Sequence, residues 1–131
     1  MPADRLKVRD AGAAGYEVVD GASVLGKFSS ISDAARFVRY QGARLWLDWG
    51  RTVIARQPAP YDFSPTFLGS DSVGRVMGEK HGPSAGTWSW SISTHDDRWR
   101  KHGGQRGREA TKDAAVAALE AEFTSYLAAT P

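Results

Sequence analysis

One stretch of sequence, TWSWSIST at residues 87–94, decides the fold class of this chain. Its alternation is strict, with Trp88, Trp90 and Ile92 at one set of positions and small hydroxyl residues at the other. Successive side chains of a strand point to opposite faces of a sheet, so the pattern predicts a strand with one buried face and one face turned to water or to a ligand. A shorter strand at residues 73–79 and a glycine-rich turn at residues 81–86 precede it, which predicts an antiparallel hairpin.

A helix is predicted after this hairpin, over residues 111–129. Thr111 is a good N-cap, and Asp113 falls in the first turn, where the helix dipole favours a carboxylate. Four apolar residues then recur at spacings of three, four and four, which places them on one helical face: Val116, Leu119, Phe123 and Leu127. Residues 72–129 are therefore predicted to form a strand–strand–helix unit.

The same order is predicted nearer the N-terminus, over residues 15–42. Strands are expected at residues 16–20 and 23–28, followed by a helix that begins after Ser30 and ends near Gly42. The triplet Asp-Ala-Ala occurs at residues 33–35 and again at residues 113–115. Either the unit is duplicated, or the triplet starts helices well and recurs by chance.

The remaining segments complete the predicted organisation. Residues 1–14 have no apolar period and are expected to be a flexible N-terminus. Residues 44–57 predict a hairpin that turns at Gly50-Arg51, and the three prolines in residues 58–70 predict an ordered connector without regular structure. We therefore expect a single α+β domain over residues 15–131, in which antiparallel hairpins form one sheet or two small ones and two helices pack on one sheet face.

Composition excludes several classes of protein. The chain has 131 residues and no cysteine, which excludes a disulfide scaffold, a thiolate nucleophile and a Cys-ligated metal site. No apolar run approaches the roughly 20 residues that cross a bilayer, and no signal-peptide pattern is present. We expect a cytoplasmic protein without a membrane partner.

Charge points to one local patch. The chain carries 17 Lys+Arg and 15 Asp+Glu, a balance too even for a protein whose whole surface binds nucleic acid. Residues 95–107, however, are polar and contain glycines, which predicts a loop, and the basic loop at residues 98–108 holds five fixed positive charges and one tryptophan. The candidate nucleic-acid-binding residues, with the cations on phosphates and the tryptophan stacked on a base, are Arg98, Trp99, Arg100, Lys101, Arg106 and Arg108. Arg36, Arg39 and Arg44 would extend such a patch; a solvated loop is the alternative interpretation.

Other constellations are weaker. Trp88 and Trp90 would line a pocket or fill the core, and the segment around His95 and His102 would bind a metal or be a polar loop. No catalytic motif is present, so we expect neither an enzyme nor a metal or cofactor site. The alternative to nucleic-acid binding is a protein-interaction or small-ligand module that uses an exposed sheet face or edge, and a self-pairing edge would give a homodimer.

Short motifs in residues 73–127 resemble a group of small bacterial proteins of uncharacterised function. They are Gly74-Arg75-Val76, Gly82-Pro83, Gly86-x-Trp88-x-Trp90 and the Ala-rich helix. The resemblance implies a compact strand–strand–helix module with no assigned activity. More loosely, the alternating strand, the basic turn and the Thr-capped helix are similar to the arm-type DNA-binding domains of phage integrases, which lay a three-stranded sheet in the major groove; the third strand here would be residues 107–110.

Overall fold

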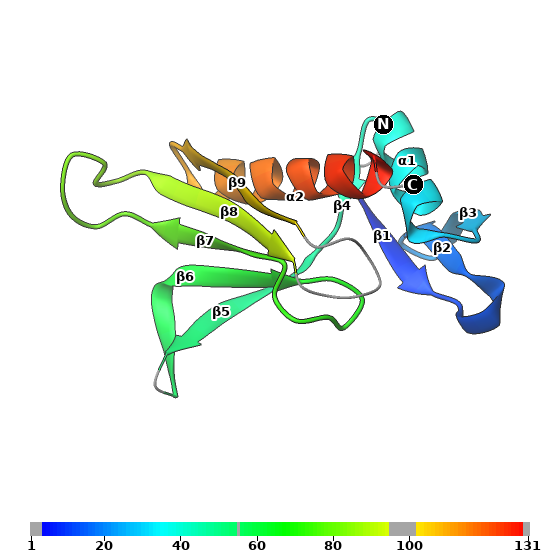
Figure 1. Ribbon diagram of the computed structural model, residues 1–131, viewed down its shortest axis with the longest axis horizontal. Coiled ribbons are helices and arrows are strands. Elements are labelled where there is room, and N and C mark those ends of the chain that lie inside the picture. The colour runs from blue at the N-terminus through cyan, green and yellow to red at the C-terminus, as the bar shows by residue number, and fades with distance from the viewer. Residues whose placement is uncertain (1–3, 55, 95–101, 130–131) are drawn as a thin grey trace. The chain divides into compact units, whose positions relative to one another are not determined.

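The chain has an α+β fold in which two sheets of mostly antiparallel strands are combined with two α-helices (Figure 1). This computed structural model describes residues 4–54, 56–94 and 102–129. The predicted fold class is confirmed, and the strands form two sheets rather than one. Residues 1–47 with 120–131 form one compact unit, and residues 48–119 form another.

The first unit contains a four-stranded sheet in the order β3-β2-β1-β4. Its strands are β1 (Arg5–Asp10), β2 (Tyr16–Asp20), β3 (Ser23–Phe28) and β4 (Arg44–Leu45), with a short 3-10 turn, η1 (Gly12–Ala14), after β1. The β1–β2 and β2–β3 pairs are antiparallel, whereas β4 runs parallel to β1. The two predicted strands at residues 16–20 and 23–28 match β2 and β3.

Helix α1 (Ile31–Tyr40) follows β3 and contacts β2, β3 and β4. Ser30 caps its N-terminus, because the Ser30 hydroxyl accepts a hydrogen bond of 3.1 Å from the backbone N–H of Asp33. Gly42, with a φ of 75°, follows the helix in the left-handed conformation that favours glycine. Ala34 and Val38 are fully buried against the sheet. The predicted start and end of this helix are therefore confirmed.

The N-terminal segment corrects the expectation of a flexible end at residues 1–14. Arg5–Asp10 forms β1, an inner strand that pairs with both β2 and β4. Leu6 and Val8 are buried, and they alternate with charged residues as in a half-buried strand. Two alternating apolar residues were too few to predict a strand from the sequence. The strand forms because β2 and β4 pair with it on both sides.

The C-terminal part of α2 (Lys112–Ala129) belongs to the first unit, and two of its side chains accept hydrogen bonds from β4 and from the segment that follows it. The Thr124 hydroxyl accepts from the backbone N–H of Leu45 at 2.8 Å, and Glu120 Oε2 accepts from that of Leu47 at 3.1 Å. Glu120 is fully buried and also accepts from Arg5 and Arg44. Each of these backbone groups therefore has a partner in place of a further strand.

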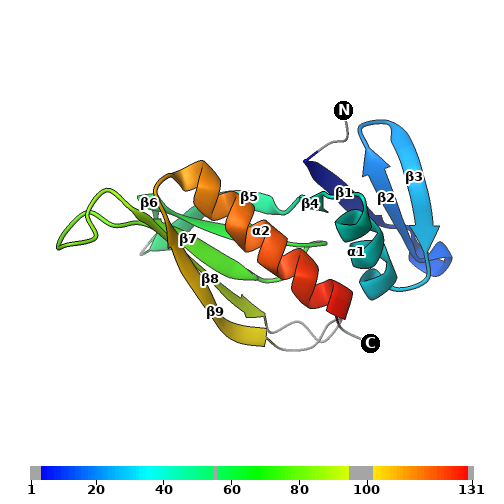
Figure 2. The ribbon, with the colours of Figure 1, turned by 90° about the horizontal axis from the view of Figure 1, so that it is seen from above.

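The second unit contains a five-stranded antiparallel sheet in the order β5-β6-β7-β8-β9. The strands are β5 (Asp48–Ile54), β6 (Gln57–Thr66), β7 (Gly74–Gly78), β8 (Trp88–Thr94) and β9 (His102–Glu109). Residues 112–119 of α2 lie against one face of this sheet (Figure 2). Val76 and Ile92 on that face are buried, as are Ala115 and Leu119 on the helix.

Three predictions for this unit were wrong. The chain does not turn at Gly50-Arg51: β5 continues through them, and the reversal comes between Ile54 and Gln57, where Arg56 has a φ of 68°. A non-glycine residue in the left-handed region gives no sequence signal of a turn. The predicted hairpin over residues 44–57 is therefore β4 of the first unit followed by β5.

The proline-rich segment at residues 58–70 is mostly strand β6 and not an irregular connector. Proline lacks the N–H that a ladder uses. Pro58 and Pro65 lie opposite Val53 and Trp49 of the edge strand β5, and the pairing with β7, at Asp62 and Phe63, includes no proline. Likewise, His102–Glu109 forms β9, where a loop was expected to continue to residue 107. Its pairing with β8 supplies the order that glycine-rich sequence does not predict.

Candidate functional site

The candidate site is the face of β7, β8 and β9 that points away from α2. In the strand register, Ser91 lies between Arg75 and Arg106, and Ser89 lies between Met77 and Arg108. Directly paired residues share a face of a sheet, so these two rows form one surface. Arg75, Arg106 and Arg108 are all exposed on it. We call this surface the serine–arginine face.

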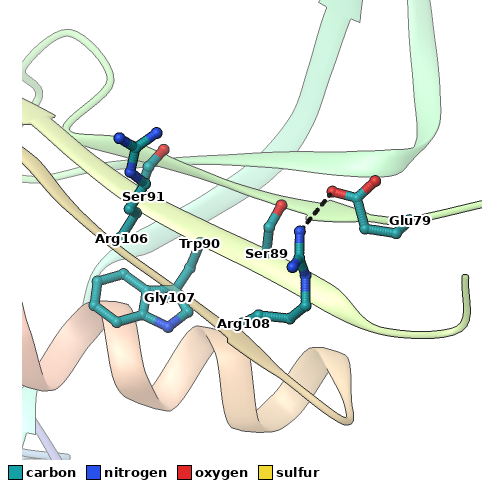
Figure 3. A pocket seen from close by; sticks show the side chains of 7 residues that line it. All are labelled: Glu79, Ser89, Trp90, Ser91, Arg106, Gly107 and Arg108. Carbon is teal, nitrogen blue, oxygen red and sulfur yellow. Dashed lines mark ion pairs between the residues drawn. The ribbon is translucent and has the colours of Figure 1, made fainter. Parts of the chain in front are cut away.

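The serine–arginine face is hollowed between β8 and β9. A depression of about 460 Å³ is lined by seven residues, drawn in Figure 3: Glu79, Ser89, Trp90, Ser91, Arg106, Gly107 and Arg108. Figure 3 shows the side chains of Ser89, Ser91, Arg106 and Arg108 on one side of the strands and the indole of Trp90 on the side of α2. Hydroxyl groups thus line the floor of the depression and guanidinium groups its rim.

The two arginines of β9 differ in how far their charge is compensated. Arg108 Nη2 lies 3.9 Å from Glu79 Oε1, and the two side chains are 51% and 26% exposed. Such an exposed pair is screened by water and contributes at most about 1 kcal/mol. Of the residues that the structure describes, none pairs with the Arg106 side chain. Both charges are therefore accessible to an anionic ligand.

Arg75, in contrast, is engaged by a neighbour on β6. Its Nε donates to both carboxylate oxygens of Asp62 at 2.8 and 2.9 Å, and its Nη2 donates to Oδ2. Thr52 Oγ1 also donates to Asp62 Oδ1 at 2.7 Å. The hydrogen bonds from Arg75 hold the pKa of the buried Asp62 carboxyl below its ordinary value, although burial acts in the opposite direction. The same pairing raises the pKa of Arg75. This ion pair links β6 to β7 beside the depression.

Trp88 and Trp90 alternate with Ser89 and Ser91 on β8, so both lie on the opposite face, where they are half-buried. Figure 3 shows the Trp90 indole on the side of α2. Trp90 Nε1 donates to Glu109 Oε2 at 3.2 Å, and the ring centroids of Trp88 and Phe63 are 6.3 Å apart. Gly107 gives Trp90 its space, because a β-carbon on residue 107 would lie 2.6 Å from Nε1. This favours the packing interpretation of the two tryptophans over that of a ligand pocket.

The predicted site residues fall into two groups. Arg106 and Arg108 lie on β9 and project from a strand, which corrects their assignment to a loop. Arg98, Trp99, Arg100 and Lys101 lie outside the described residues, as do His95 and the two aspartates that follow it. Sequence reasoning missed Arg75 and Glu79. The alternation in the predicted strand at residues 73–79 could have placed both on the polar face.

Two of the three arginines that would have extended the basic patch, Arg36 and Arg44, have partners in the first unit. Arg44 Nε donates to Glu120 Oε1 at 2.9 Å. Arg36 donates from Nη1 to Asp33 at 2.7 Å and from Nε to the carbonyl of Ala128 at 2.8 Å. These two charges stabilise the first unit, so we assign neither to the candidate site.

Within the described part of the chain, no three His, Asp or Glu side chains gather as metal ligands. Neither of its α-helices is long and apolar enough to span a bilayer. Comparisons with models of protein families, with curated proteins and with solved structures give no match. The case for a function therefore rests on the geometry of the serine–arginine face.

Proposed function

We propose that the chain is a non-enzymatic module that binds nucleic acid through the serine–arginine face. The observation that carries the proposal is the placement of Arg106 and Arg108 on one exposed strand face, opposite Ser91 and Ser89 on β8. Guanidinium groups bind phosphates or the acceptor atoms of guanine, and hydroxyl groups hydrogen-bond to any base edge. A cytoplasmic location, expected from the sequence, is part of this proposal.

Duplex nucleic acid is the preferred form in this proposal. Three strands at about 4.8 Å spacing measure about 10 Å across, which fits a major groove about 12 Å wide. The face that α2 leaves open carries serines and arginines, whereas Trp88 and Trp90 alternate with the serines and lie on the other side. A surface that binds single strands would need stacking rings on the open face. The loose similarity to integrase arm-type domains supports the same geometry, with β9 as the third strand.

The predicted basic residues between β8 and β9 in the sequence enter the proposal as additional contacts. Arg98, Arg100 and Lys101 would hold phosphates, and Trp99 would stack on an unpaired base. We therefore expect Trp99→Ala to weaken binding to a single strand more than binding to a duplex. Removing the three charges together should weaken binding to both.

Fluorescence anisotropy with a labelled duplex of mixed sequence, and with one of its strands, tests the proposal. The affinity should fall steeply as salt is raised from about 50 to about 200 mM. Arg106→Ala and Arg108→Ala should each weaken binding and reduce the salt slope by about one. Arg9→Ala is the matched control, because Arg9 also forms an exposed cross-strand pair, with Glu17 at 2.8 Å. Absence of salt-dependent binding, or equal affinities for all three variants, would refute the proposal.

A further inference from the structure

The outer edge of β3 is the least protected sheet edge in the described part of the chain. β4, at the other end of the same sheet, has two residues, and α2 accepts hydrogen bonds from Leu45 and Leu47. β5 and β9, the edges of the second sheet, carry two and three Asp, Glu, Lys or Arg residues. β3 has six residues, SVLGKF, of which only Lys27 is charged. Charged residues, short strands, β-bulges and coverage by a helix are the usual means of preventing edge-to-edge pairing. The ladders of β3, β5 and β9 each contain one register irregularity, so the number of charges is what distinguishes β3.

β3 also exposes apolar side chains. Val24 and Leu25 are adjacent in the strand and are 43% and 44% exposed. Val24 pairs with Val19 on β2, and Leu25 lies at a bulge, between Val24 and Gly26, that has no counterpart on β2. Two neighbouring apolar residues on an open edge present a surface that a further strand would cover.

Lys27, the one charged residue of β3, has a counter-charge on the neighbouring strand β2. Lys27 Nζ lies 3.8 Å from Glu17 Oε2, and the two residues are cross-strand partners on β3 and β2. Glu17 also accepts a hydrogen bond from Arg9 Nε at 2.8 Å, so it compensates the charge of Lys27 only in part. The edge is left with one partly compensated charge.

We propose that the chain forms a twofold homodimer by antiparallel pairing of β3 with β3 of a second copy, so that two four-stranded sheets become one continuous sheet. The sequence of β3 is compatible with antiparallel pairing to a second copy of itself. In registers centred on Leu25 or Gly26, Lys27 faces Ser23 or Leu25 of the second copy and never another charge. Leu25 faces Leu25 of the second copy in the first register, and Val24 faces Phe28 in the second. This inference goes beyond nucleic-acid binding and does not depend on it.

Sedimentation equilibrium of the full chain without nucleic acid tests the proposal. The mass should rise with concentration from 14.2 kDa towards twice that value. Val24→Lys and Leu25→Lys should each weaken the dimer by about tenfold or more, because they place a second charge on the edge. Val53→Lys is the matched control, since Val53 is 65% exposed on β5, an edge of the other sheet. All three sites are exposed, and circular dichroism checks that each variant is folded.

The outcomes separate clearly. A monomer at every concentration overturns the proposal, as does a dimer that survives both β3 substitutions or that Val53→Lys dissociates. A second measurement uses the absence of native cysteine. A nitroxide label on Ser23→Cys should report a defined pair distance in the dimer. A short, defined pair distance for the same label on Val53→Cys, with none for Ser23→Cys, would place the interface on β5.

Discussion

Arg5 on β1 donates hydrogen bonds from Nε and Nη2 to both carboxylate oxygens of Glu120 on α2, at 2.9 and 2.6 Å, although 115 residues separate them in the sequence. The carboxylate is fully buried, whereas the Arg5 side chain is a quarter exposed and covers the ring of Trp46 at 4.3 Å. A buried carboxylate requires partners for its charge, and Arg44 and the backbone N–H of Leu47 complete the set.

Glu120→Gln should therefore destabilise the protein strongly. The substitution keeps the volume of the side chain but leaves two guanidinium groups without their carboxylate, for which we expect a loss of about 2–4 kcal/mol in the free energy of unfolding. Urea denaturation followed by circular dichroism measures it. Asp33→Asn is the control, because the Asp33–Arg36 pair is about half exposed and should change stability by less than about 1 kcal/mol. Equal effects of the two substitutions would contradict the structural role of Glu120.

The Asp62–Arg75 pair predicts a specific dependence of stability on pH. The pKa of Asp62 is lower in the folded chain than its ordinary value of 3.8. The pair therefore stabilises the fold fully above about pH 5, and its contribution is lost as the pH falls below 3.8 and through the folded pKa. Asp62→Asn should destabilise the protein by about 1–2 kcal/mol at pH 7, with discounting for the exposure of Arg75.

The measurement is urea denaturation of both proteins from pH 7 to pH 3. The difference between wild type and Asp62→Asn should stay constant in the upper part of this range and shrink at its acid end. A difference that grows as the pH falls would mean that the carboxyl is protonated in the fold, contrary to the bonding described.

Gly107→Ala should disturb the packing of Trp90. The new β-carbon would lie 2.6 Å from Trp90 Nε1, so the indole must move and its hydrogen bond to Glu109 must lengthen or break. We expect a loss of about 1–3 kcal/mol in stability, together with a shift in tryptophan fluorescence. Gly50→Ala is the matched control in another strand, since nothing lies within 4 Å of a β-carbon there. Its stability should be unchanged or slightly raised.

Glu79→Gln should tighten nucleic-acid binding if the serine–arginine face is the interface. Glu79 is the counter-charge that lies 3.9 Å from Arg108, and a phosphate must compete with it. Without this charge the affinity should rise a few-fold and the salt slope by up to about one. Anisotropy titrations at several salt concentrations measure both. A weaker complex would instead assign Glu79 a direct contact to the ligand.

Local patterns predicted the elements whose signals are local. The cap at Ser30 and the strands at residues 16–20 and 23–28 follow from short-range chemistry, and so does the last helix. The Thr111 hydroxyl accepts from the backbone N–H of Ala114 at 3.1 Å, as an N-cap should. The alternation at residues 87–94 correctly separated the polar face from the aromatic one, because each residue's face depends only on its position in the strand.

Long-range partners decided what the sequence could not predict. β1 is a strand because β2 and β4 flank it. β6 is a strand because it pairs along most of its length with β5, and its short pairing with β7 includes no proline. The hydrogen-bond donors to Glu120 are more than 70 residues away in the sequence, so no local pattern predicts them. At the candidate site, the predicted arginines of β9 are on one face, but Arg75 and Glu79 join them only through the register of three strands.

The hydrogen bonds from Leu45 and Leu47 to Thr124 and Glu120 form because the spacing of the two acceptors along α2 matches the spacing of the two donors along the chain. Four residues of helix rise about 6 Å, and two residues of extended chain span about 6.7 Å, so the two acceptors on α2 match the amides of Leu45 in β4 and of Leu47 just after it. The match permits one alignment of helix and strand. Deleting a single residue between Glu120 and Thr124 would rotate one acceptor by about 100° around the helix. Length variation in this chain should therefore be tolerated in its turns and excluded from this five-residue stretch.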